Sequence, residues 1–149
     1  VLQSLLMETS PYVKADAALL LLVDDESAYV AAGRGFEAHT TAEALKAFEA
    51  PLRTLAPLAW MAEQKRPLLI EDTGRYTGWP ELEALRWVGA QVSAPLIFDG
   101  LLLGFLLLQN AKANTFNERD PERLMAFAGP AALALHAAVL YAELQAAEE

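Results

Sequence analysis

The residues best suited to bind a ligand lie in one polar and aromatic stretch, residues 72–87. An aspartate can accept a hydrogen bond from a ligand amine or hydroxyl, and an arginine can hold a carboxylate or phosphate with two parallel hydrogen bonds. Tyrosine and tryptophan suit a planar ligand because each ring offers an apolar face and a polar tip. The candidate ligand-binding residues are therefore Asp72, Thr73, Arg75, Tyr76, Trp79 and Trp87.

These residue types also have structural explanations. An aspartate that directly follows a strand commonly caps a turn, which would account for Asp72 without a ligand. Trp60, Trp79 and Trp87 would serve equally well as an apolar lid over a core. An arginine such as Arg75 is also common on a protein surface, where water solvates it. The sequence leaves both interpretations open.

The sequence contains no pattern typical of catalysis or of metal binding. It has no cysteine, which excludes thiolate chemistry, disulfides and cysteine-ligated metals. The two histidines, His39 and His136, are not arranged with Thr73 or Ser93 in a way that indicates a hydrolytic triad. We therefore expect no catalytic residue, no metal site and no enzymatic activity in this segment.

Composition and charge narrow the class of protein further. The chain has 149 residues, of which 54% are hydrophobic, enough for one domain with one sizeable core. Its net charge of −9 repels a phosphate backbone, so nucleic-acid binding is not expected. The uninterrupted apolar runs are much shorter than the roughly 20 residues of a membrane span, and no signal peptide is recognised. We expect a cytoplasmic segment cut from a longer protein.

The apolar pattern predicts an α+β fold with an antiparallel sheet of five or six strands. Residues 1–14 have the pattern of the end of an amphipathic helix. Residues 17–24 and 28–34 form a predicted hairpin, and a capping box at Thr40 and Glu43 begins a region of short helices broken by prolines. A strand at 67–71 and a short helix from about Pro80 follow. The terminal helices should cover one face of the sheet, and short helices and loops the other.

A second hairpin and a long helix complete the predicted order. Asp99-Gly100 separates apolar runs at 88–98 and 101–110 and suits a two-residue turn. Pro95 within the first run indicates an edge position, a bulge or a break. From Pro121 to the end the pattern is helical, and Gly129-Pro130 should interrupt or kink the helix.

The long helix carries two apolar stripes. One stripe can cover the sheet, whereas the other needs a different partner, and a second copy of the same helix is the simplest choice. The predicted dimer interface consists of Leu133, Leu140 and Leu144 on this second stripe. We expect a homodimer through the N- and C-terminal helices.

Three blocks of this sequence, in this order, resemble a GAF domain, a sensory module of signalling proteins. They are RPLLIEDT at 66–73, QVSAPLIFDGLLLGFLLLQN at 91–110, and FNERDPERLMAFAGPAALALHAAVLYAEL at 116–144. The resemblance implies a single GAF domain over 1–149, with a profilin-like, PAS-related fold. Residues 1–14 would be the end of an N-terminal linker helix, and 121–149 a C-terminal helix running into a signalling linker.

The resemblance to GAF domains implies a fold but no single class of ligand. GAF domains bind cyclic nucleotides, bilins, haem, small aromatics or 2-oxo acids, or only dimerise. This chain has no cysteine for a covalent bilin or for methionine sulfoxide reduction. Asn110, Lys112, Phe116 and Asp120 partly match the cyclic-nucleotide pattern, but Ala111 and Pro121 depart from it, so the cofactor stays unknown.

The sequence therefore predicts a sensory or regulatory GAF domain of a bacterial histidine kinase, diguanylate cyclase or transcription regulator. A small molecule would bind between the sheet and residues 72–87, and a dimeric terminal helix would relay the signal. The alternative is a ligand-free module for dimerisation and linkage, with a solid core in place of a ligand cavity.

Overall fold

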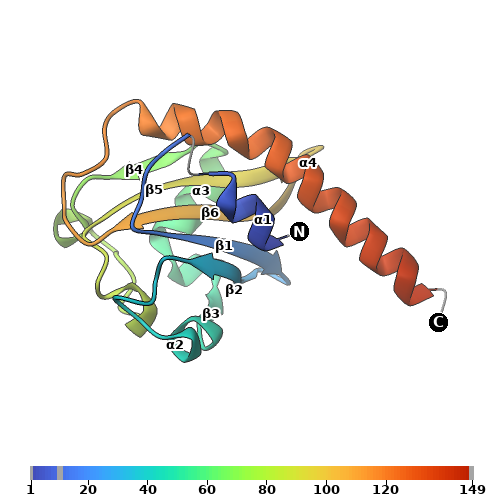
Figure 1. Cartoon of the computed structure of the whole chain (residues 1–149), viewed down its shortest axis with the longest axis horizontal. Coiled ribbons are helices and arrows are strands. Elements are labelled where there is room, and N and C mark those ends of the chain that lie inside the picture. The colour runs from blue at the N-terminus through green and yellow to red at the C-terminus, as the bar shows by residue number, and fades with distance from the viewer. Residues whose placement is uncertain (1, 10–11, 148–149) are drawn as a thin grey trace.

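The computed structural model of the chain describes residues 2–9 and 12–147. Residues 1, 10, 11, 148 and 149 lie outside the described part, so the predicted helices at 1–14 and 121–149 are compared only within it. The elements, in chain order, are α1 (Leu2–Met7), β1 (Ala17–Asp24), β2 (Ser27–Arg34), α2 (Ala42–Lys46), β3 (Glu49–Pro51), η1 (Leu52–Thr54), α3 (Ala56–Gln64), β4 (Leu68–Ile70), η2 (Thr73–Arg75), η3 (Glu83–Leu85), β5 (Ala90–Phe98), β6 (Leu101–Asn110) and α4 (Asp120–Ala147), as Figure 1 shows.

The strands form one antiparallel sheet of six, in the order β3-β2-β1-β6-β5-β4. The two predicted hairpins are confirmed as β1–β2 and β5–β6, and they meet through β1 and β6, where Leu21 lies opposite Phe105. The predicted fold class is therefore correct, with six strands. Figure 1 shows the short strands β3 and β4 at the two margins of the sheet.

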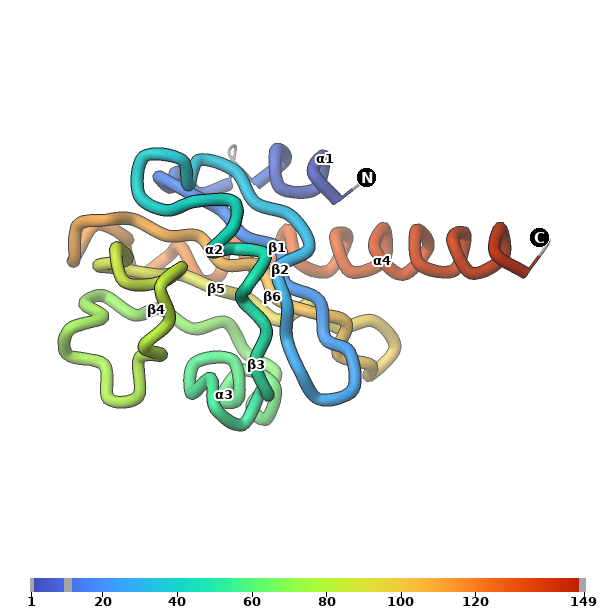
Figure 2. The backbone as a smooth tube through the Cα atoms, turned by 90° about the horizontal axis from the view of Figure 1, so that it is seen from below, coloured from blue at the N-terminus to red at the C-terminus, as the bar shows by residue number. Residues whose placement is uncertain are grey.

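Side chains alternate across the strands, so the sheet has two apolar faces. The helix face, which includes Leu20, Val92 and Leu106, packs against α1 and α4. The loop face, which includes Leu21 and Phe105, is covered by short helices and turns instead. Figure 2 shows α3 on the opposite side of the strands from α1 and α4.

Two positions in the second hairpin follow from backbone geometry. A Cβ atom at Gly104 would lie 2.0 Å from the Leu21 carbonyl oxygen, so only glycine lets β1 approach β6 this closely. Pro95 has no backbone N–H to donate, and β4 pairs with β5 only over residues 91–93. Pro95 therefore lies past the end of β4, on a free edge of β5, as the sequence indicated.

α4 is one continuous helix. Of the two outcomes predicted at Gly129-Pro130, an interruption of the helix is therefore wrong. Pro130 lies inside the helix and is exposed. Figure 1 shows the helix bending and its later turns leaving the sheet. Leu124, Phe127 and Leu135 are buried on the helix face.

By length and composition alone, α4 is apolar enough to cross a membrane, with a mean hydropathy of 1.7 over its most apolar window. Its first half is packed against the sheet, which is the position of a core helix in a globular domain.

The middle of the chain differs from the prediction in three places. The cap of α2 is Thr41, whose hydroxyl accepts a hydrogen bond from the Ala44 N–H at 3.1 Å, rather than Thr40. The helix expected from Pro80 is only the single turn η3. The strand β3 was not predicted, because three residues that include a proline give no apolar alternation.

Candidate functional site

Asp72 and Thr73 fix the start of the segment 72–87. The Asp72 carboxylate accepts a hydrogen bond from the Gly74 N–H at 2.9 Å and so caps η2. The Thr73 hydroxyl donates to the Val88 carbonyl at 2.7 Å, and the Thr73 N–H donates to the Gly89 carbonyl at 2.9 Å. These bonds tie the segment to the start of β5, so Asp72 has the turn-capping role that was its structural explanation.

Asp72, Arg75 and Tyr76 line one surface groove of about 430 Å³, together with Asn114. The Arg75 Nε lies 3.9 Å from an Asp72 carboxylate oxygen, a loose ion pair in which the arginine side chain is almost fully exposed. Partial burial raises the pKa of the Tyr76 hydroxyl because it disfavours the charged phenolate. Glu71 also lines this groove, which therefore offers two carboxylates, a guanidinium and a neutral phenol close to the surface.

Thr73 and Trp79 line a different groove, of about 330 Å³, with Arg86 and Val88. Trp79 is half-buried and packs against the apolar core of the loop face. The segment thus divides its candidate residues between two grooves on the surface.

Trp87 lies apart from both grooves. Its indole stacks on the His39 ring, with centroids 4.2 Å apart and planes 6° from parallel. Its Nε1 is buried and has no hydrogen-bond acceptor among the described residues. The stack joins the loop after β2 to the segment before β5. The structure therefore does not bring the six predicted residues together around one cavity.

Side chains fill the interior of the loop face. Met61 and Phe105 are fully buried there, and Leu85 and Leu107 are nearly so. Leu85 comes from the segment 72–87 itself, so part of this segment is a piece of the core. Trp60 and Trp79 pack against the same cluster from its margin.

The three leucines of the predicted dimer interface are exposed along α4. Leu133 is 54% exposed, Leu140 51% and Leu144 60%, and none faces the sheet. Within residues 2–9 and 12–147, no group of three histidine, aspartate or glutamate side chains is arranged to hold a metal ion.

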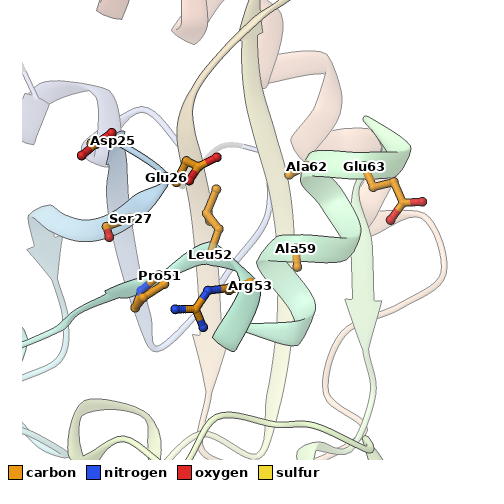
Figure 3. Close-up of a pocket in the computed structure, with 9 residues that line it drawn as sticks. All are labelled: Asp25, Glu26, Ser27, Pro51, Leu52, Arg53, Ala59, Ala62 and Glu63. Carbon is orange, nitrogen blue, oxygen red and sulfur yellow. The ribbon is translucent and has the colours of Figure 1, made fainter.

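A larger hollow, of about 620 Å³, was not predicted from the sequence. Figure 3 shows its lining, which comes from the β1–β2 turn, from residues 51–53 and from α3. These segments become neighbours only in the folded sheet. The one available signal was Asp25-Glu26, a two-residue hairpin turn without glycine.

A six-stranded antiparallel sheet between two terminal helices and a layer of short helices defines an α+β sandwich with its grooves at the margins of the loop face. A sequence model described as "GAF domain" matches residues 1–136. The chain therefore belongs to the GAF domain family. No curated protein matches the chain in sequence.

Solved structures share this fold at low sequence identity. The GAF domain of a phosphoenolpyruvate-protein phosphotransferase from Coxiella burnetii is 20% identical, with a TM-score of 0.74 over 98% of this chain and 84% of that one. The GAF-B domain of DevS from Mycobacterium smegmatis is 19% identical, with a TM-score of 0.74 over 96% of each chain. A free methionine-R-sulfoxide reductase from Thermoplasma acidophilum is 14% identical, with a TM-score of 0.72 over 90% and 89%. At these identities the likeness shows the fold alone.

Proposed function

We propose that this chain is a regulatory GAF domain of a multidomain bacterial signalling protein, such as a two-component kinase, and that it relays a signal through α4 in a homodimer. The observation that carries the proposal is the exposed apolar stripe on α4. Sequence similarity to the GAF family and structural similarity to a domain described as part of a two-component sensor histidine kinase support the signalling role. In this proposal residues 1–149 are one domain, and α4 continues into a linker.

The spacing of the stripe favours a coiled coil. Leu133, Ala137, Leu140 and Leu144 recur at intervals of four, three and four residues, which places them on one seam of a helix. All four are exposed, whereas the stripe that ends at Leu135 is buried on the sheet. An exposed apolar stripe of this size is typical of a surface that binds another protein chain.

The continuity of α4 supports the relay. One continuous helix joins the sheet-packed turns to the exposed stripe, so a change in sheet packing can alter the position of the stripe. Such coupling requires that the signal stabilises one arrangement of α4 more than the other.

The packed loop face favours the ligand-free form of this proposal, in which the domain dimerises and links its neighbours. A second candidate, small-molecule sensing, is favoured by the groove of Asp72, Arg75 and Tyr76, which, with Glu71, offers one cation, two carboxylates and a phenol to a polar ligand. In both forms we propose a cytoplasmic domain without enzymatic activity, since the sequence offers no cysteine for the reductase chemistry of one structural neighbour.

Sedimentation of a double variant tests the dimer. Leu140→Glu with Leu144→Glu places two charges on the seam and should give a folded monomer, because buried charges in a coiled coil are unpaired. The matched control, Ala142→Glu with Gln145→Glu, adds the same charge outside the seam and should remain a dimer. A variant that sediments as the wild-type dimer would refute the helix interface.

A thermal-shift screen distinguishes the ligand-free module from the small-molecule sensor. The probes are cyclic nucleotides, nucleotides, 2-oxo acids and aromatic acids. A ligand that binds only the folded state adds about 2.7 kcal/mol of stability at a hundredfold excess over its Kd. A saturable shift that Arg75→Gln abolishes supports the sensor, and a cooperative melt that no probe shifts supports the ligand-free module.

A further inference from the structure

The large hollow lies at the opposite end of the sheet from the segment 72–76. It sits beside the β1–β2 turn, past Asp24, whereas Ile70 pairs with Gln91, which pairs through Gln109 with Ala17 at the other end of β1. The hollow is therefore separate from the grooves considered above.

The two hairpin turns of the sheet show that Glu26 is an unusual choice at its position. Both are two-residue turns in the left-handed region: Asp99 and Gly100 have φ of 51° and 78°, and Asp25 and Glu26 have φ of 48° and 67°. The second position of such a turn favours glycine, because a side chain costs energy at positive φ. The β5–β6 turn follows this preference and the β1–β2 turn does not. Glu26 therefore keeps its side chain at the expense of backbone strain.

That side chain faces the apolar floor of the hollow. The Leu52 N–H donates to the Glu26 carbonyl at 2.8 Å, which holds the turn against η1. In Figure 3 the Leu52 side chain points toward Glu26, and Ala59 and Ala62 come from the face of α3 turned toward Leu52. The carboxylates of Asp25 and Glu63 point away from Leu52, which leaves Glu26 as the acid over the floor.

Arg53 supplies a positive charge at the end of the hollow away from Glu26. In Figure 3 its side chain extends from η1 on the side away from Glu26. Within the described part of the chain, the ion pairs are Arg75–Asp72 and Arg123–Asp120, so Glu26 and Arg53 are both without a protein partner. From one end to the other, the hollow thus offers a carboxylate, an apolar floor and a guanidinium. Its volume is typical of small-molecule sites.

We propose that this hollow binds a small zwitterion with an apolar body, such as a short amino-acid derivative. Its ammonium group pairs with the Glu26 carboxylate, its apolar chain lies on Leu52, Ala59 and Ala62, and its carboxylate pairs with the Arg53 guanidinium, which can donate two parallel hydrogen bonds. The site is independent of the proposed relay and of the grooves beside residues 72–87.

Titration of the whole chain with three probes of one length tests the charge pattern. The probes are 6-aminohexanoate, hexylamine and hexanoate, and amide chemical shifts in the NMR spectrum report both affinity and location. We expect 6-aminohexanoate to bind most tightly and to shift the amides of Leu52, Ala59 and Ala62. Each single-charge probe should bind about twofold to fivefold more weakly, the contribution of one ion pair near the surface.

Variants assign each end of the ligand. Glu26→Gln should remove the advantage of 6-aminohexanoate over hexanoate, and Arg53→Gln its advantage over hexylamine. Glu37→Gln, outside the hollow, is the matched control and should change neither. Absence of binding, equal binding of hexylamine, or affinity unchanged in Glu26→Gln would each overturn the proposal.

Glu26→Gly separates ligand binding from folding. Because it relieves the left-handed strain, it should raise the melting temperature by about 2 °C while it weakens 6-aminohexanoate binding as much as Glu26→Gln does. A destabilised glycine variant would instead show that Glu26 serves the fold and would refute a ligand role.

Discussion

The two faces of the sheet are covered in different ways. The helix that covers one face is suited to relay a signal, whereas the short elements that cover the other face are suited to form local grooves. On the helix face, the single helix α4 supplies buried residues from Leu124 to Leu135, beside Leu5 and Leu6 of α1, and then leaves the sheet as one continuous helix. On the loop face, no single element covers the core; α2, α3 and several turns each cover a part. A continuous helix can transmit a displacement along its length, whereas several short helices and turns leave grooves where they meet.

The largest expected effect tests whether both faces are solid cores. Phe105→Ala on the loop face should cost about 3–5 kcal/mol, and Leu124→Ala on the helix face about 2–5 kcal/mol, since both side chains are fully buried. Leu101→Ala, at a 59% exposed residue, is the control and should change stability by less than about 0.5 kcal/mol. Urea unfolding measures all three. A cost below about 1 kcal/mol for Phe105→Ala would reveal a loose loop face with room for a ligand.

The next largest effect concerns the bend of α4 at Pro130. Pro130→Ala restores a backbone N–H that can donate to the Ala126 carbonyl, and it should stabilise the domain by about 1 kcal/mol. Proline is about 3 kcal/mol worse than alanine inside a helix, but it also restricts the unfolded chain. Urea unfolding gives the free energy. Destabilisation would show instead that the bend is needed to keep Leu135 on the sheet.

A smaller effect compares one aromatic stack on each face. His39 stacks on Trp87 at 4.2 Å, and His136 stacks on Phe98 at 4.5 Å where α4 leaves the sheet. His136→Ala should cost about 1 kcal/mol and the more exposed His39→Ala about 0.5 kcal/mol. Tryptophan fluorescence should change only in His39→Ala. An equal change in both variants would mean that the two faces are coupled through the sheet.

The smallest effect is the titration of Tyr76, in the groove beside β4. Burial raises its pKa above the ordinary value of 10.0, so the unfolded chain loses this proton at lower pH than the folded domain does. The contribution of Tyr76 to stability is thus complete below pH 10.0 and declines as pH rises through the folded-state pKa. Phenolate absorbance should contain a component that titrates above pH 10.0 and is lost in Tyr76→Phe. A titration curve above pH 10.0 that Tyr76→Phe leaves unchanged in shape would contradict this burial.

The sequence predicted the strands and α4 because their apolar patterns are long. Residues 17–23 form a continuous apolar run, and the α4 stripe repeats over several turns, so burial is encoded locally. β3 escaped prediction because its three residues form a strand only through pairing with β2. The segment 72–87 is rich in polar and aromatic residues, but its path depends on hydrogen bonds from Thr73 to Val88 and Gly89.

By itself, the sequence determined the α+β class and the amphipathic terminal helix, since periodicity and turn chemistry are properties of neighbouring residues, and three of its blocks resembled a GAF domain. Only the tertiary structure decided which side chains share a groove. It distributed the predicted ligand residues between two grooves and the Trp87–His39 stack, and it brought Glu26 and Arg53 to one hollow. The physical reason is that a strand of eight residues carries adjacent turns to opposite ends of the sheet, so nearness in sequence does not fix nearness in space.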